Sequence, residues 1–142
     1  TPKPSSAASD VYKRQPSKSE DLQLFQIWIQ PDTIGVKPGY TQQSFRREEK
    51  LNTLRLLVSK DGREDSQKIH QDVDLYASVL ESGKSLEFKL RPERGVWIQL
   101  ADGELSVNGN TLKAGDGLAV EDEEVLSLQA SRDTEFLLFD LR

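Results

Sequence analysis

Short runs in which apolar and polar residues alternate occupy most of the chain beyond residue 72. In residues 73–80 (VDLYASVL) every second side chain is apolar, and these side chains would share one face of an extended segment. Similar short runs follow at residues 86–90, 96–100, 104–107, 112–114, 118–120, 125–129 and 135–141. Because a period of two is typical of a strand with a buried face, each run predicts a β-strand.

Glycine-containing turns separate these runs. Residues 102–103 (Asp-Gly) and 108–109 (Asn-Gly) each join two runs, and both pairs supply the positive backbone angles that a tight hairpin needs. Residues 115–117 (Gly-Asp-Gly) form a third turn of this kind. Strands that recur about every eight residues, with such turns and no strong helical pattern, predict an all-β fold. The fold would be a small antiparallel sandwich or a jelly-roll β-barrel.

The pattern is less regular before residue 73. Residues 22–30 (LQLFQIWIQ) are dense in strand-forming side chains and predict a strand, and residues 31–40 hold the prolines and glycines of a turn-rich connector. Residues 42–50 are polar and fit either a short surface helix or an extended arm. Residues 51–58 (LNTLRLLV) fit a buried strand or a helical turn, and the turn signal after them favours the strand. Residues 59–68 predict a charged, mobile loop.

Residues 1–21 have a composition unlike the rest of the chain. They are rich in Ser, Pro, Lys and Ala, with too few large apolar side chains to offset the entropy of ordering, so we expect a disordered tail. The piece SAASDVYKRQ resembles translated adaptor or linker sequence. In that case the natural protein would extend upstream, and this chain would be a carboxy-terminal fragment. The alternative is a flexible basic tail whose Lys13, Arg14 and Lys18 contact a partner.

Charge and composition exclude several classes of function. The 142-residue chain has a net charge of -5, from 19 Lys and Arg against 24 Asp and Glu. This balance gives no basic footprint for nucleic acid or for an anionic membrane. The sequence contains no cysteine, no apolar run near the length that spans a bilayer, and no secretory signal pattern. These features predict one soluble, cytoplasmic domain.

A single histidine, His70, limits the metal chemistry that the chain can support. A zinc site of three histidines and an iron site of two histidines and one carboxylate both need more than one histidine in the monomer. His70 could instead act as a proton shuttle whose tautomer is fixed by Asp72 or Asp74. The alternative is a structural role, in which this histidine caps a turn or hydrogen-bonds the backbone just before the next strand.

The glycines between residues 83 and 117 have the spacing of the two motifs of the cupin family. The first cupin motif places His-x-His and a glutamate between two glycines, and the second places Pro-x-Gly and a histidine after a third. The glycines at positions 83, 103, 109 and 117 match, and a glycine at position 115 replaces the proline. The four metal-ligand positions carry Lys89, Arg91, Val96 and Val120. The resemblance therefore implies a cupin-type barrel whose ligand positions are degenerate, with no metal, cofactor or catalytic site of its own.

The register of the strand at residues 86–90 is open at this stage. Motif spacing points Lys89 and Arg91 into the barrel, whereas alternation points Leu86, Phe88 and Leu90 inward. A shift of one residue moves every side chain to the opposite face, so only one of the two can hold. Since Phe88 and Leu90 do not bind metal either, both registers predict a barrel without metal ligands.

Longer phrases resemble a narrower family. LQLFQIWIQP, IHQDVDLY, RGVWIQLADGELSVNG, DGLAVEDEE and EFLLFDL are similar to the second half of pirin-like bicupins, over about residues 22–141. In that family two cupin domains pack together, the amino-terminal one holds an iron-type divalent metal, and some members are quercetin 2,3-dioxygenases. The resemblance implies that residues 51–142 form the carboxy-terminal cupin. Residues 22–50 would lead from an absent amino-terminal cupin, which would carry the metal and be the partner of this chain.

Three functions are compatible with this resemblance. In the first, the chain supports a metal-bearing cupin that oxidises a flavonol or related phenolic with dioxygen. In the second, the barrel binds a small apolar or phenolic ligand, with Phe88 and Ile98 among its inward side chains. In the third, it is an interaction or regulatory domain that uses the acidic residues 121–124. The first also predicts an uncovered apolar strip at residues 22–29 and self-association of the isolated chain.

Overall fold

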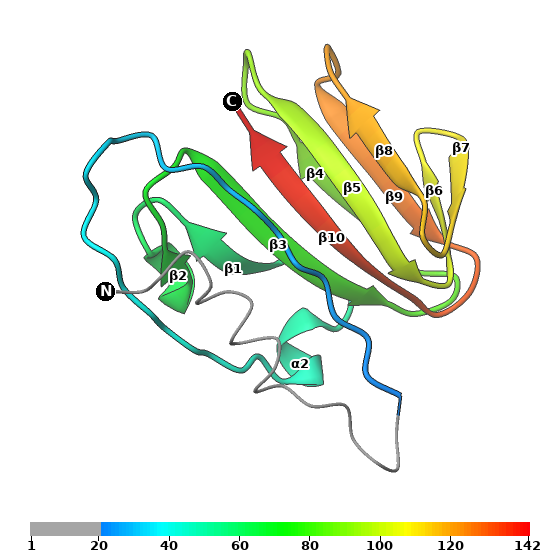
Figure 1. The fold of residues 1–142 in the computed structure, drawn as a ribbon. Helices are drawn as coiled ribbons and strands as arrows, with labels where there is room; N and C mark the ends of the chain where they lie inside the picture. The colour runs from blue at the N-terminus through cyan, green and yellow to red at the C-terminus, as the bar shows by residue number, and fades with distance from the viewer. Residues whose placement is uncertain (1–20) are drawn as a thin grey trace.

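Two β-sheets packed face to face make up the body of the protein (Figure 1). The computed structural model describes residues 21–142. The first sheet has six strands in the order β2-β1-β3-β10-β5-β8, and the second has four in the order β4-β9-β6-β7. The elements are β1 (Arg55–Ser59), β2 (Gln67–Lys68), β3 (Val73–Leu80), β4 (Ser85–Lys89), β5 (Gly95–Asp102), β6 (Glu104–Val107), β7 (Asn110–Lys113), β8 (Gly117–Val120), β9 (Val125–Ala130), β10 (Thr134–Leu141), the short helix α2 (Arg47–Lys50) and the 3-10 helix η1 (Arg63–Asp65).

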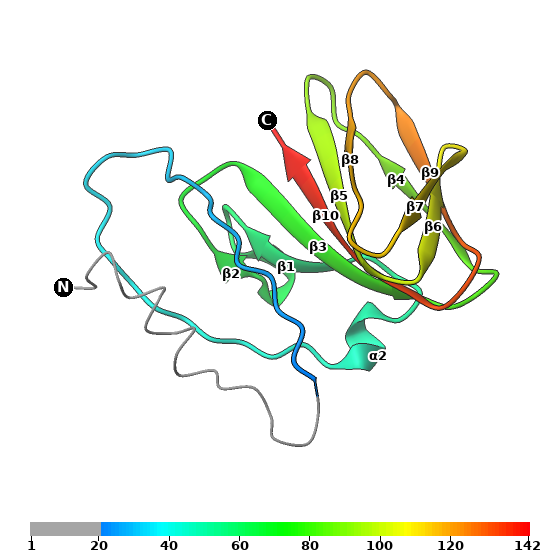
Figure 2. The same ribbon diagram turned by 45° about the vertical axis from the view of Figure 1, so that its right-hand side comes forward.

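The all-β antiparallel sandwich predicted from the alternation is confirmed. Strands β4, β6, β7 and β9 form one layer and the longer strands of the first sheet form the other (Figure 2). The one parallel pair among the named strands joins β1 to the short β2. Within residues 21–142, no helix has both the length and the apolar character to cross a membrane.

Inward side chains of both sheets form one hydrophobic core. In β5, Val96, Ile98 and Leu100 are at most 3% exposed, as the period of two in this run predicts. Facing side chains of β10, β6 and β9 complete a cluster in which buried strand residues interdigitate. Its members are Leu80, Leu90, Val96, Ile98, Leu100, Leu105, Val107, Leu112, Leu126, Leu128, Ala130, Phe136 and Leu138.

The two predicted hairpins are present, and the structure requires glycine in each of them for a different reason. Asn108 and Gly109 both have positive φ (46° and 86°), which suits the tight turn between β6 and β7. Gly103, between β5 and β6, has a φ of 88°, and a Cβ at this position would overlap the carbonyl oxygen of Asp133 and the side chain of Thr134. The turn between β6 and β7 needs Gly109 for its backbone angles, and the turn between β5 and β6 needs Gly103 also because a side chain would not fit.

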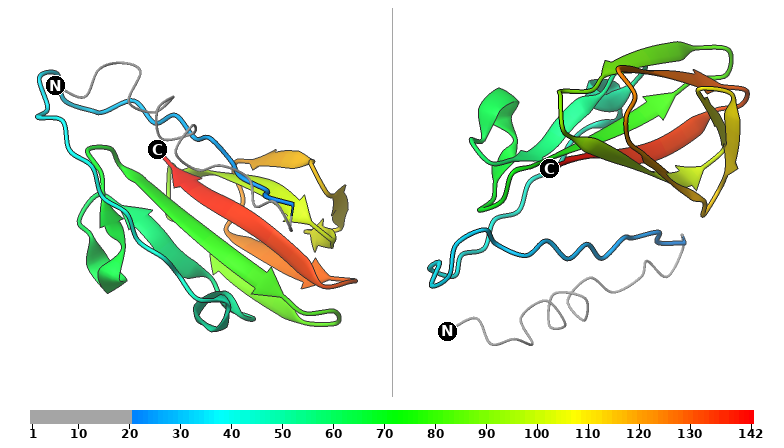
Figure 3. Two further views of the ribbon diagram at one scale, coloured as in Figure 1. Left: turned by 60° about the horizontal axis from the view of Figure 1, so that its bottom comes forward. Right: turned by 90° about the horizontal axis from the view of Figure 1, so that it is seen from above.

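The strand predicted for residues 22–30 is not formed, so that prediction is wrong. This segment, which we call the arm, is extended but has no place in either sheet. It runs alongside the outer face of β10 and β5 (Figure 3), where the Gln23 amide Nε2 donates to the carbonyl of Ala101 at 3.1 Å. Near its end the Gln71 amide Nε2 donates to the carbonyl of Gln30 at 2.9 Å. A strand requires pairing as well as strand-forming side chains, and sequence pattern reports only the second.

The connection from the arm to the sheets is partly as predicted. Residues 31–40 contain turns and bends, and residues 47–50 of the polar segment form the single helical turn of α2. Strand β1 begins at residue 55, later than predicted, although Leu51 makes an isolated parallel bridge with Val79. Residues 59–68 are more ordered than the mobile loop predicted from their charge, since they contain η1 and β2. The predicted tail lies outside the described residues except for its last residue.

Strand β3 differs from its prediction because both of its faces are covered. Alternation predicts a half-buried strand, yet every residue of β3 except Tyr76 is buried. The strand lies between β1 and β10 in the first sheet, where Asn52 also donates its backbone N–H to the carbonyl of Val79 at 2.7 Å. The central position of β3 therefore brings Asp74 into a buried environment.

Candidate functional site at the barrel mouth

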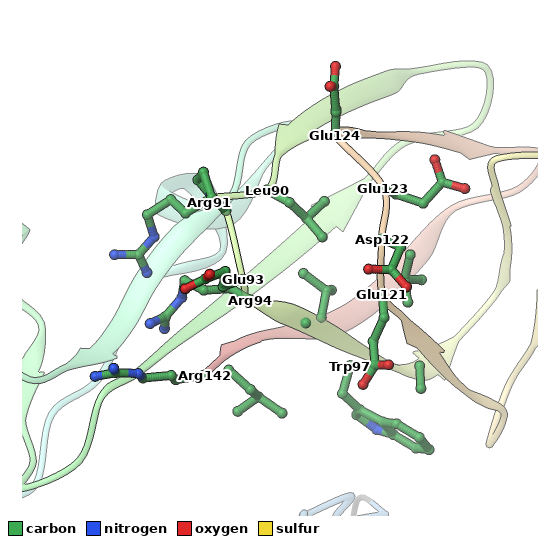
Figure 4. A pocket seen from close by; sticks show the side chains of 16 residues that line it. Leu90, Arg91, Glu93, Arg94, Trp97, Glu121, Asp122, Glu123, Glu124 and Arg142 are labelled. Atoms are coloured by element: carbon green, nitrogen blue, oxygen red, sulfur yellow. The ribbon is translucent and has the colours of Figure 1, made fainter.

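Three of the four residues predicted at degenerate ligand positions lie around a single cavity. We call this end of the barrel the mouth: the loop between β4 and β5 meets the loop after β8 there (Figure 4). Arg91, Val96 and Val120 line this cavity of about 700 Å³, whereas Lys89 does not and is exposed at the end of β4. The other lining residues are Leu90, Pro92, Glu93, Arg94, Gly95, Trp97, Ala119, Glu121, Asp122, Glu123, Glu124, Leu141 and Arg142.

The register of β4 follows hydrophobic alternation. Leu90 is buried and Leu86 and Phe88 pack against the core, while Lys89 is exposed on the other face. The Phe88 ring meets the Tyr76 ring edge-on, with 5.7 Å between centroids and 67° between planes. Alternation therefore outweighs motif spacing along β4, because a shift of one residue would expose this apolar set.

The floor of the cavity is apolar. Val96 and Val120 lie directly opposite each other in the pairing of β5 with β8. Val96 is 3% exposed and belongs to the core, and Val120 is half-buried and packs against it. Neither side chain has an atom that can ligate a metal, so these two of the four predicted positions contribute only packing.

Two buried carboxylates lie at the mouth on neighbouring strands. Asp74 of β3 and Asp140 of β10 are direct cross-strand partners, and they are 4% and 2% exposed. Their side chains point to the same face of the sheet as those of Tyr76 and Leu138, which pack in the core. Like charges directly opposite in a sheet destabilise it, and buried charges require partners. This pair therefore needs cationic groups close by.

Arg91 bridges these two carboxylates. Its Nη2 donates to Asp74 Oδ2 at 2.8 Å and to Asp140 Oδ2 at 2.7 Å, and its Nε donates to Asp140 Oδ2 at 3.2 Å. Arg63 of η1 also binds Asp74: its Nη2 donates to Oδ2 at 2.7 Å and its Nη1 donates to Oδ1 at 3.2 Å. Arg91, which motif spacing assigns to a cupin histidine position, thus supplies a positive charge to these two carboxylates.

Arg94 completes the ion-pair network on the opposite side. Its side chain is 8% exposed, its Nε donates to Asp140 Oδ1 at 2.6 Å, and its Nη1 donates to Asp72 Oδ2 at 2.8 Å. Nη2 donates to the backbone carbonyls of Asp72 and Asp140. The planar guanidinium therefore fixes the β10 end against the start of β3, which a point charge such as lysine would do less well.

The pKa values follow from these contacts. Hydrogen bonds to Asp74 raise the pKa of Arg63. Burial lowers the pKa of Arg94, but hydrogen bonds to Asp140 and Asp72 outweigh it and the pKa is raised. The hydrogen bond from Arg94 lowers the pKa of Asp72 below its ordinary value of 3.8. At neutral pH Arg63 and Arg94 therefore stay cationic and keep their ion pairs with the carboxylates of the network.

The residues of the mouth do not fit a metal ion. Within residues 21–142, no group of three or more His, Cys, Asp or Glu side chains is placed to hold one. Asp72 and Asp74, the two carboxylates considered as partners of His70, are bound by arginines instead. His70 itself is exposed before β3, and its backbone carbonyl accepts the N–H of Asp32 at 2.7 Å. This contact involves the backbone and not the imidazole, so both roles considered for His70 stay predictions.

Sequence reasoning missed the ion-pair network as a unit. A signal was present, because Asp74 and Asp140 each interrupt an apolar strand at an inward position. Arg91 lies 17 residues from Asp74 and 49 residues from Asp140 along the chain, so no local spacing connects it to them. The acidic residues 121–124, singled out from sequence, are exposed and form the rim opposite Arg91 and Arg94 (Figure 4).

Comparison with known proteins agrees with this geometry. Residues 56–141 match a family model described as the quercetinase C-terminal cupin domain. The chain is 41% identical over 126 residues to a quercetin 2,3-dioxygenase of Escherichia coli strain K12, covering 89% of this chain and 53% of that relative. It is 32% identical to a pirin-like protein of Caulobacter vibrioides, covering 85% of this chain and 53% of the relative. The chain thus spans about half the length of the curated relatives it matches.

Solved structures give the same assignment. The crystal structure of YhhW from E. coli superposes with a TM-score of 0.76 at 38% identity, over 81% of this chain and 48% of that one. A structure of the same bacterial pirin in complex with nickel(II) gives a TM-score of 0.75 at 38% identity, over 80% of this chain and 48% of that one. The matched part of the relatives is their carboxy-terminal half. The chain belongs to the pirin and quercetinase family as its C-terminal cupin domain.

Proposed function

We propose that this chain is the supporting, metal-free cupin of a two-cupin oxygenase. The metal-bearing partner would be the amino-terminal cupin of the relatives, the half of their length that the match to this chain does not cover. That partner would hold an iron-type divalent ion, and the full protein would oxidise quercetin or a related phenolic with dioxygen in the cytoplasm. The observation that carries the proposal is the network of Arg91 with Asp74 and Asp140 at the mouth, since it balances charge there without a metal.

The two other functions, binding of a small ligand and a regulatory contact, remain predictions. A small phenolic ligand would have to bind in the cavity of the mouth, because the inward side chains below it form one packed cluster. A regulatory contact through residues 121–124 would use an exposed rim of four carboxylates. Neither has a contact among residues 21–142 that favours it over the supporting role.

A chimera tests the supporting role. Residues 22–142 replace the carboxy-terminal half of the E. coli quercetin 2,3-dioxygenase, and the chimera is compared with that relative's amino-terminal half alone. We expect the chimera to retain nickel or iron at about one ion per chain and to oxidise quercetin, and the half alone to lose both. Substituting Arg91→Ala in the chimera should leave the metal content unchanged. An amino-terminal half as active as the chimera, or metal lost with Arg91→Ala, would contradict the proposal.

A further inference from the structure

A cavity that shares no lining residue with the mouth lies between the connector and the segment that contains β2. The connector loops out past β2, the edge strand of the six-stranded sheet (Figure 1). Near the start of this loop, the backbone N–H of Asp32 donates to the carbonyl of His70 at 2.7 Å. Just after its end, Thr41 Oγ1 donates to Gln67 Oε1 at 3.1 Å. The loop, bonded at both ends, borders a cavity of about 430 Å³ that we call the basic pocket.

The side chains around the basic pocket carry positive charge. Lys37 of the connector and Lys68 of β2 line it together with His70, and its lining includes no Asp or Glu side chain. In the part of the chain that the structure describes, neither lysine forms an ion pair. The carboxylate of Asp32 is bound by Lys60 Nζ at 2.6 Å. Although the chain has a net charge of -5, this pocket is therefore locally positive and attracts anions.

The rest of the basic pocket combines apolar surface with hydrogen-bond donors. Pro31 and Ile69 contribute aliphatic surface, and Tyr40 contributes an aromatic side chain that is 64% exposed. His70 is exposed, and an imidazole has an N–H donor in both its neutral and its charged form. A concave site of this size, with apolar walls and a few polar groups, is typical of small-molecule binding. These groups suit a ligand that has an anionic end and a flat apolar body.

We propose that the basic pocket binds a small aromatic carboxylate. The carboxylate would pair with Lys37 and Lys68, and the ring would pack against Tyr40 and Ile69. An inorganic anion would use only the charges and a neutral ring would use only the apolar wall, so a ligand with both parts is preferred. The inference does not rest on the proposed function, because no residue of the basic pocket lines the mouth. It gives this chain a binding activity that needs no metal.

Nuclear magnetic resonance tests this inference on the chain itself, because His70 is its single histidine and gives one imidazole signal. The probes are benzoate, benzyl alcohol and inorganic phosphate, each titrated at constant pH and ionic strength. We expect benzoate to shift the imidazole signal saturably, with a Kd on the order of 1 mM. Benzyl alcohol and phosphate should each bind about tenfold more weakly, because each lacks one of the two kinds of contact. Benzoate that binds no more tightly than either of them would overturn the inference.

Matched variants assign the binding to this pocket. Lys37→Gln and Lys68→Gln each remove one exposed charge, and each should weaken benzoate binding about threefold. Lys84→Gln is the control, because Lys84 is also exposed but lies between β3 and β4, outside the basic pocket. Tyr40→Ala should weaken benzoate binding about threefold and leave phosphate binding unchanged. The backbone amide spectrum of each variant reports whether it is folded. Equal benzoate affinity in the double lysine variant and in Lys84→Gln would refute the basic pocket as the binding site.

Discussion

Removing Arg94 should destabilise the fold more than removing any other arginine of the mouth. Its guanidinium is 8% exposed and makes charge-assisted hydrogen bonds to Asp140 at 2.6 Å and to Asp72 at 2.8 Å. Breaking a buried ion pair from one side costs about 3–5 kcal/mol, because the remaining charge stays buried. Since Arg91 would still reach Asp140, we expect Arg94→Ala to cost about 3 kcal/mol, at the lower end of that range.

Arg91 binds the same Asp140 carboxylate as Arg94, but its side chain is far more exposed. The side chain of Arg91 is 50% exposed, so water screens its pairs, and Arg91→Ala should cost about 1 kcal/mol. Arg132 is exposed and has no ion pair among the described residues, so Arg132→Ala is the control. Urea unfolding followed by far-ultraviolet circular dichroism measures each free energy. For Arg94→Ala the melting temperature should fall by about 10 °C. A cost for Arg94→Ala no larger than that for Arg132→Ala would refute the stabilising role of the network.

The same variant has a defined pH dependence. Arg94 lowers the pKa of Asp72 in the folded state below the value of 3.8. A depressed carboxylate pKa stabilises the fold fully above the unfolded pKa, and this contribution is lost as the pH falls through the folded pKa. The stability difference between the natural chain and Arg94→Ala should therefore be constant from pH 7 to pH 5 and should narrow below pH 3.8. A difference that grows at low pH would contradict the assigned contact.

Two further outcomes follow from the fold and from the exposed apolar side chains of the arm. Gly103→Ala and Gly109→Ala both place a side chain at positive φ, but only the first overlaps neighbouring backbone. We therefore expect thermal denaturation to show a loss of about 1 kcal/mol for Gly109→Ala and at least about 2 kcal/mol more for Gly103→Ala; equal losses would contradict the overlap at Gly103. In sedimentation velocity, the isolated chain should self-associate at high concentration through its exposed apolar strip. Ile27→Asp should reduce that association and Ile34→Asp should not, and equal association of the two variants would argue for another contact surface.

Local pattern predicted the parts of the fold that depend on local chemistry. The Asn108-Gly109 hairpin and the alternation of β5 need only neighbouring residues, and both are present. The arm was predicted as a strand because its side chains favour one, but pairing depends on a partner strand that sequence pattern does not report. The burial of both faces of β3 likewise depends on its central position in the sheet, which is a tertiary property.

The candidate site also contains residues that the sequence predicted and contacts that only the fold creates. Motif spacing identified Arg91, Val96 and Val120, and the structure brings these three residues to one cavity. It did not identify why an arginine is suitable there, because Asp74 and Asp140 come from two other strands. Lys89 was also placed by spacing, and the structure turns it outward because Phe88 and Leu90 take the inward positions.

Isothermal titration of the isolated chain with nickel(II) or iron(II) tests the central claim most directly. The mouth carries a guanidinium between its two buried carboxylates, and the chain has a single, exposed histidine. We therefore predict no saturable binding at micromolar metal and less than about one-tenth of an ion per chain by elemental analysis after dialysis. Saturable binding of one ion per chain that is lost on substituting Asp74→Asn or Asp140→Asn would contradict the account of a metal-free supporting cupin.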